Sequence, residues 1–269
     1  MDASPPPEAG GPRIREIPLR LLLPNLITVS AICAGLSGIR LAFEHRFEIA
    51  VVMVLIAAFL DGIDGRVARM LKATSKFGAQ MDSLADIVNF GAAPALVLYA
   101  YLLDKAGSPG WIAALLFAIA CGLRLARFNV LTEDDRRPAW QGAYFVGVPA
   151  PAGALLVMLP VYLGFLGVEP DRTYAFVASG FTILVAVLLV SRLPVHSGKN
   201  AFGSIPGDKA LPAMLAFAAY VAMLFAYPWQ TLSVTACAYL CFLPFSARMY
   251  ARTAKREMGN ERPDEPNEL

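Results

Sequence analysis

Long apolar stretches dominate the sequence and limit it to a small set of folds. A helix needs about 20 mostly apolar residues to cross a lipid bilayer. Stretches of that kind lie at approximately residues 24–43, 48–66, 84–103, 110–129, 147–167, 173–191, 209–227 and 229–248. Only 16% of the residues are charged, whereas soluble domains carry about 25%. The sequence therefore predicts an all-α polytopic membrane bundle with about eight transmembrane helices.

The placement of lysine and arginine predicts how this bundle is oriented. If both termini are cytoplasmic, all but four of the 23 Lys and Arg residues fall on the cytoplasmic side, the exceptions being Arg40, Arg46, Lys105 and Arg172. Cytoplasmic loops of membrane proteins carry such an excess of positive charge. We therefore expect both termini in the cytoplasm. The net charge of only +2 gives no reason to expect a nucleic-acid partner.

The two ends of the chain differ from its apolar middle. Residues 1–12 are rich in proline and glycine, which predicts a disordered tail. Residues 13–23 mix basic and apolar side chains, as is typical of a helix that lies at the membrane interface. We therefore expect one membrane-embedded domain over residues 13–250, followed by a cytoplasmic tail at 251–269.

Four aspartates lie in two neighbouring segments, DGIDGRVAR at residues 61–69 and GAQMDSLAD at residues 78–86. At about 100° per residue, the aspartates of each segment share one helix face with small or polar residues. These faces hold Asp61, Asp64, Gly65 and Ala68 in the first helix, and Gly78, Asp82, Asp86 and Asn89 in the second. The residues between the segments can reverse the chain, so that the two faces meet.

Four adjacent carboxylates cannot all carry charge without a positive partner. Carboxylate oxygens in this number suit Mg²⁺ or Mn²⁺, and two ions held by shared carboxylates are an arrangement used in phosphoryl chemistry. The sequence therefore predicts a divalent metal site. The alternative is a charge-paired helix end, in which Asp61 and Asp64 pair with Arg66 and Arg69.

The pattern D-x-x-D-G-x-x-A-R-x8-G-x3-D-x3-D, which this chain matches at every fixed position, resembles the signature of the CDP-alcohol phosphotransferase family. The resemblance implies a core of six spans, so that eight spans would be six plus two. It implies that Asp61, Asp64 and Asp82 ligate metal, and that Asp86 contacts metal and acts as general base on the acceptor hydroxyl. It also implies a CDP site that includes Gly65, Ala68, Arg69 and Gly78, with Asn25 and Thr28 contacting the nucleotide. An N-cap or an interhelical hydrogen bond is the alternative role for Asn25 and Thr28.

Two further segments bear on the acceptor. RLARFN at residues 124–129 and FVGVPAP at residues 145–151 resemble segments of bacterial and archaeal family members that use serine. The resemblance implies transfer of a phosphatidyl group from CDP-diacylglycerol to L-serine with release of CMP. Arg124 and Arg127 would then bind the serine carboxylate or a phosphate; the alternative is a pair of cationic membrane anchors. Glycerol 3-phosphate, an inositol compound and choline are the alternative acceptors.

A cation-coupled transporter is the more distant alternative, because acidic residues in apolar helices also line ion pathways. The aspartate pattern is not repeated elsewhere in the sequence, and its aspartates lie at one predicted membrane face. Both features favour an enzyme. The family resemblance further implies a homodimer in the cell (inner) membrane, and the placement of lysine and arginine predicts an active site that faces the cytoplasm.

Overall fold

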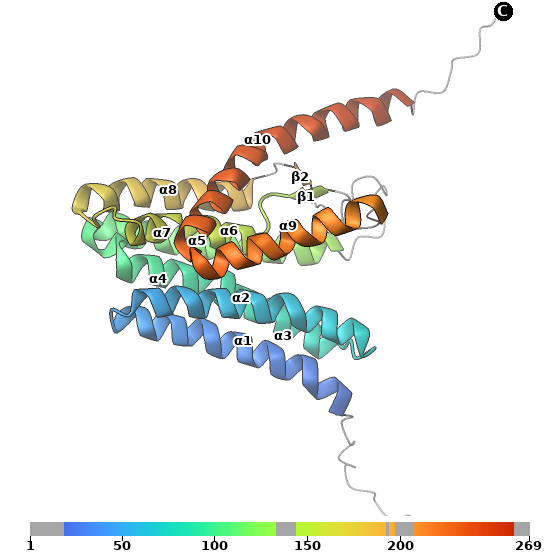
Figure 1. The fold of residues 1–269 in the computed structure, drawn as a ribbon, viewed down its shortest axis with the longest axis horizontal. Coiled ribbons are helices and arrows are strands. Elements are labelled where there is room, and N and C mark those ends of the chain that lie inside the picture. The colour runs from blue at the N-terminus through green and yellow to red at the C-terminus, as the bar shows by residue number, and fades with distance from the viewer. Residues whose placement is uncertain (1–18, 133–143, 192–193, 197–206, 261–269) are drawn as a thin grey trace, which may run out of the picture.

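The computed structural model describes residues 19–132, 144–191, 194–196 and 207–260. The first half holds α1 (Leu19–Phe43), α2 (Phe47–Met70), α3 (Lys76–Asp86), the π-helical turn η1 (Ile87–Ala92), α4 (Ala93–Tyr101), the 3-10 turn η2 (Leu103–Ala106) and α5 (Ser108–Thr132). The second half holds β1 (Tyr144–Val146), α6 (Ala150–Val157), α7 (Leu159–Phe165), α8 (Arg172–Val190), β2 (Pro194–His196), α9 (Gly207–Ala226) and α10 (Pro228–Asn260). Most helices run roughly parallel or antiparallel along one direction, with α1 and α2 at one side and α10 leaving the bundle toward its C-terminal end (Figure 1).

The predicted class, a helical membrane protein, is confirmed. Within the described residues, four helical segments are long and apolar enough to cross a membrane: Leu22–Phe43, Lys76–Tyr101, Ser108–Val130 and Arg172–Val190. Two shorter apolar helices cover Ala150–Phe165 and Ala210–Ala226. The strands β1 and β2 form a short antiparallel pair that the apolar pattern did not predict. The number of spans and the side on which the termini lie remain predictions.

Small residues let α1 and α2 pack closely. A Cβ atom on Gly38 would lie 3.0 Å from the carbonyl oxygen of Ala50, so the two backbones are nearly in contact there. Ala31, Ala42 and Ala57 are also fully buried. Close approach through small residues is the usual way in which membrane helices associate. It places the start of α1 directly beside the end of α2.

A tight turn joins α2 to α3. Lys72 has a left-handed backbone with φ of 49°, and the N–H of Ala73 bonds to the carbonyl of Ala68 at 2.8 Å. This is how many helices end. Ser75 then caps α3, because its hydroxyl oxygen accepts a 3.0 Å hydrogen bond from the N–H of Gly78. The third helical segment therefore begins at residue 76, eight residues before the predicted apolar stretch.

The π-helical turn η1 follows Asp86 directly. The N–H of Ala93 bonds to the carbonyl of Val88, five residues back, instead of four. The wider turn buries Asn89, Phe90 and Gly91. Such turns are frequent at functional sites, and this one changes the direction in which residues after Asp86 face.

Candidate active site

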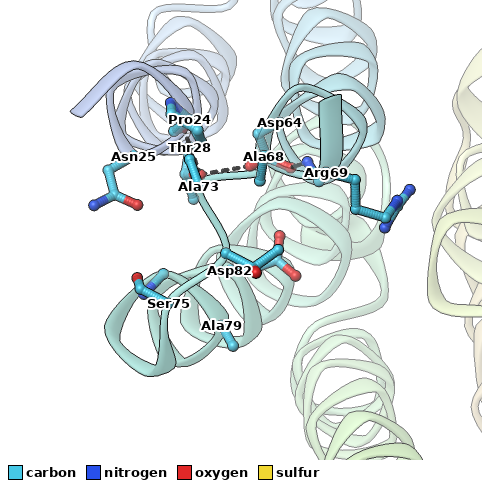
Figure 2. Close-up of a pocket in the computed structure, with 13 residues that line it drawn as sticks. Pro24, Asn25, Thr28, Asp64, Ala68, Arg69, Ala73, Ser75, Ala79 and Asp82 are labelled. Carbon is cyan, nitrogen blue, oxygen red and sulfur yellow. Dashed lines mark hydrogen bonds between the residues drawn. The ribbon is translucent and has the colours of Figure 1, made fainter. Parts of the chain in front are cut away.

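A cavity of about 200 Å³ lies where the start of α1, the end of α2 and the start of α3 meet (Figure 2). All six residues expected to contact the nucleotide line it: Asn25, Thr28, Gly65, Ala68, Arg69 and Gly78. Two of the four aspartates, Asp64 and Asp82, lie at its wall. Residues from three helices therefore meet around one cavity; the aspartate pattern predicted that α2 and α3 face each other, and α1 adds Asn25 and Thr28.

The aspartates converge beside this cavity. Asp61, Asp64 and Asp82 each offer one carboxylate oxygen, and these atoms lie within 4.8 Å of one another. The carboxyl group of Asp86 adjoins that of Asp61. One oxygen of Asp61 is buried and, among the described residues, has no hydrogen-bond partner. An all-carboxylate set with an unpaired buried oxygen fits a hard divalent cation such as Mg²⁺ or Mn²⁺.

Asp64 is held in a fixed orientation by neighbours on both helices. It is 2% exposed. The hydroxyl of Thr28 donates to Oδ2 at 2.5 Å, and the N–H of Gly65 donates to Oδ1 at 2.5 Å. Figure 2 shows the bond from Thr28 crossing from α1 to α2. The interhelical hydrogen bond considered for Thr28 is thus present, and Thr28 lines the cavity as well.

The arginines near the end of α2 do not neutralise the aspartates through ion pairs. In the described part of the chain, no salt bridge joins Asp61 or Asp64 to Arg66 or Arg69. Arg69 is exposed at the edge of the cavity and extends outward from α2 (Figure 2). The charge-paired helix end is therefore not the arrangement found, and Arg69 is free to approach a ligand in the cavity.

The two arginines of α5 have different surroundings, although they are one turn apart. Arg124 is only 8% exposed, and its guanidinium carbon lies 5.4 Å from the centre of the Phe128 ring. Arg124 is within electrostatic reach of Asp86. Arg127 instead donates a 2.7 Å hydrogen bond to the carbonyl of Val190 at the end of α8. The structure thus brings Arg124 toward the aspartates and gives Arg127 a contact that ties α5 to α8.

Comparison with protein families agrees with the geometry. The model of the family described as CDP-alcohol phosphatidyltransferase matches residues 21–191, which include the aspartates and the cavity. The chain belongs to the CDP-alcohol phosphatidyltransferase family. A second model, described as CDP-alcohol phosphatidyltransferase 2, matches residues 210–244 in α9 and α10. The family predicted from the aspartate pattern is therefore confirmed.

Several relatives cover most of the chain. It is 43% identical over 241 residues to the CDP-diacylglycerol–serine O-phosphatidyltransferase of Mycobacterium tuberculosis, covering 89% of this chain and 82% of that protein. It is 37% identical over 228 residues to the enzyme of the same name from Helicobacter pylori, covering 82% and 89%. It is 31% identical over 182 residues to the archaetidylserine synthase of Methanothermobacter thermautotrophicus, covering 66% and 71%.

Asn89 is a residue to which the sequence alone assigned no role. It is fully buried in η1, and neither atom of its amide has a hydrogen-bond partner in the ranges that the structure describes. Its amide lies beside Asp61, and a Cβ atom on Gly35 would lie only 2.6 Å from its Oδ1. Its spacing from Asp82 and Asp86 put Asn89 on the same predicted helix face as these aspartates. This spacing was the one feature of the sequence that pointed to Asn89 as a site residue. An unpaired buried amide beside a carboxylate cluster indicates a functional contact.

Proposed function

We propose that this chain transfers a phosphatidyl group from CDP-diacylglycerol to the hydroxyl of L-serine and releases phosphatidylserine and CMP. The main support for this type of reaction is the cavity described above. All six residues that we expect to contact the nucleotide line it, and three aspartates cluster next to it. The choice of serine is supported by relatives named as serine transferases, the first of which match this chain over 82% of their length. Glycerol 3-phosphate, an inositol compound and choline remain the alternative acceptors.

The aspartates are the proposed metal ligands. Asp61, Asp64, Asp82 and Asp86 would hold Mg²⁺ or Mn²⁺, and we propose two such ions. Such ions would neutralise the charge of the pyrophosphate. Arg69, at the edge of the cavity, adds positive charge on the nucleotide side.

Small residues make room for the CDP group. Gly65 has open space where a side chain would be, since a Cβ atom there would have Nη1 of Arg69, at 3.7 Å, as its nearest neighbour. Gly78 is tighter, because a Cβ atom there would meet Asn25 and Ser75 at 3.2 and 3.1 Å. Ala68 completes this wall. The nucleotide therefore binds along Gly65, Ala68 and Gly78, with Asn25 and Thr28 opposite.

The transfer is a direct displacement at the phosphorus atom that carries diacylglycerol. The serine hydroxyl oxygen bonds to this phosphorus, and the bond from phosphorus to the oxygen of CMP breaks. Asp86 accepts the hydroxyl proton, which is the role of a general base. Arg124, within electrostatic reach of Asp86, binds the serine carboxylate and so orients the hydroxyl; Arg127 supplies further positive charge.

The proposed setting is the cell (inner) membrane, with eight spans, six forming the family core, and both termini in the cytoplasm. The end of α2 and the start of α3 lie at the same end of the bundle as β1 and β2 (Figure 1), and we place this end at the cytoplasmic face. The membrane domain covers residues 13–250, with tails at 1–12 and 251–269. Of the proposed interfacial segment 13–23, the described residues 19–23 continue into α1. The active form is a homodimer.

The decisive experiment measures CMP release by the purified protein in detergent, with CDP-diacylglycerol and Mg²⁺ or Mn²⁺. Serine, glycerol 3-phosphate, inositol, inositol phosphate and choline are supplied one at a time, and Asp82→Asn serves as the inactive control. Release with serine alone supports the proposal. Release with a different acceptor refutes the choice of serine but keeps the chemistry. Solute flux in proteoliposomes without CMP release would instead support the transporter.

A further inference from the structure

A tyrosine of the last helix lies near Arg124 and has no role in the reaction described so far. Tyr239 belongs to α10, and its hydroxyl oxygen is buried. In the part of the chain that the structure describes, neither this hydroxyl nor Nε of Arg124 has a hydrogen-bond partner. The phenol and the guanidinium are within electrostatic reach of each other. Two buried polar groups on helices distant in sequence, each with an atom that has no partner among the described residues, thus interact electrostatically in an apolar bundle.

Such an arrangement needs a ligand. A buried polar group without a partner costs about 1–3 kcal/mol, and the cost applies to both side chains here. Each of them can donate a hydrogen bond, since the guanidinium carries only donors and the phenol carries one. The missing group therefore offers several acceptor lone pairs and negative charge. A carboxylate fits this description, because it accepts up to about four hydrogen bonds and pairs with a guanidinium.

The neighbours of Arg124 indicate which ligand brings this carboxylate. Arg124 is also within electrostatic reach of Asp86, the proposed base. A molecule that presents its hydroxyl to Asp86 and its anionic group to Arg124 and Tyr239 needs both groups within a few bonds of each other. An amino acid with a side-chain hydroxyl has this chemistry, as does glycerol 3-phosphate, whereas choline, which lacks an anionic group, does not.

We infer that Tyr239 is a specificity-determining residue, whose hydroxyl donates a hydrogen bond to the carboxylate of the acceptor amino acid held by Arg124. The inference rests on the proposed function. It also extends the site beyond residues 21–191, which the first family model matches, into the segment 210–244 matched by the second. The last helix then contributes to acceptor selection, in addition to its packing against α7.

The test is Tyr239→Phe, which removes the hydroxyl and keeps the ring. Its matched control is Tyr220→Phe, because Tyr220 lines the same small cavity between α6, α9 and α10 as Tyr239, but its hydroxyl bonds to Thr235 at 3.1 Å. Both variants are compared with the unmodified protein for the KM of L-serine, the KM of CDP-diacylglycerol, kcat and thermal unfolding in detergent. L-serinamide, which has no carboxylate, is tested as an acceptor and as a competitive inhibitor.

We expect Tyr239→Phe to raise the KM of serine by about tenfold or more, as for loss of a hydrogen bond to a charged group. The KM of CDP-diacylglycerol and the affinity for serinamide should stay within about twofold, and Tyr220→Phe should change neither KM. An unchanged KM for serine, or an equal rise for both substrates, would overturn the inference. If the unmodified protein releases CMP with another acceptor and not with serine, the proposed function fails first, and that result is distinct from a failure of the role of Tyr239.

Discussion

Replacing Gly35 with alanine tests whether the position of Asn89 matters for catalysis. The new methyl carbon would lie 2.6 Å from Oδ1 of Asn89. Carbon and oxygen atoms in contact are separated by about 3.3 Å, so the amide must move by about 0.7 Å. The next nearest atoms to this carbon lie at 3.7 Å or more, so the strain falls on Asn89.

The movement should reach the aspartates, because the amide of Asn89 lies beside Asp61. A misplacement of about 1 Å can lower a rate about 100-fold, so a shift of about 0.7 Å should lower kcat by about tenfold or more. Overpacking costs about 1–3 kcal/mol of stability, and the better helix propensity of alanine returns about 1 kcal/mol. We therefore expect a folded protein with low activity.

The assay is CMP release at saturating substrate, together with thermal unfolding in detergent. Gly180→Ala is the neutral control, because nothing lies within 4 Å of a Cβ atom there. Gly38→Ala is the packing control, since its methyl group would meet the backbone of Ala50 at 3.0 Å. If Gly35→Ala keeps normal kcat, or if Gly38→Ala lowers kcat equally at equal loss of stability, the reasoning about Asn89 is wrong.

Three further substitutions test the site. Asp86→Asn should reduce the rate of CMP release by about 100-fold or more, as expected for loss of a general base, while binding of CDP-diacylglycerol, measured by calorimetry, persists. Substantial turnover by this variant would show that Asp86 is not the general base. Thr28→Val removes the hydroxyl that donates to Asp64 and should weaken Mn²⁺ binding, measured by electron paramagnetic resonance, by about 10–100-fold. Unchanged Mn²⁺ affinity would show that Asp64 is oriented without the hydroxyl of Thr28. Ser75→Ala removes the cap at Gly78 and should lower stability by about 1 kcal/mol, whereas an unchanged melting temperature would indicate that packing alone positions α3.

The apolar stretches predicted most helices but not all of their boundaries. Hydropathy reports which residues can face lipid, and by that measure the third stretch begins near residue 84. The helix begins at Lys76 instead, because the hydrogen bond from Gly78 to Ser75 starts it in polar sequence. The pairing of β1 with β2 depends on contacts between residues about 50 positions apart, which local periodicity does not contain.

Helical periodicity also brought the aspartates to one place, because both segments are regular α-helix up to Asp86. Helical periodicity could not distinguish the surroundings of Arg124 from those of Arg127, because both are arginines and they lie on adjacent turns of the same helix. Their difference arises from α8, whose last carbonyls lie beside Arg127. Likewise, nothing in the local sequence of Tyr239 reveals its proximity to Arg124, since more than 100 residues separate them. Roles that depend on tertiary neighbours required the structure.

The π-helical turn after Asp86 has a consequence for how this enzyme family can change. An inserted residue rotates the helix before it relative to the helix after it by about 100°. In this chain, α1 packs against both α3 and α4, and α4 also contacts α2, α5, α6 and α7. The π-helical turn sets which face each of the two helices, α3 and α4, presents to α1. Deletion of a single residue within η1 would therefore turn one of these faces away from α1, and we expect it to move Asp82 relative to the proposed metal site.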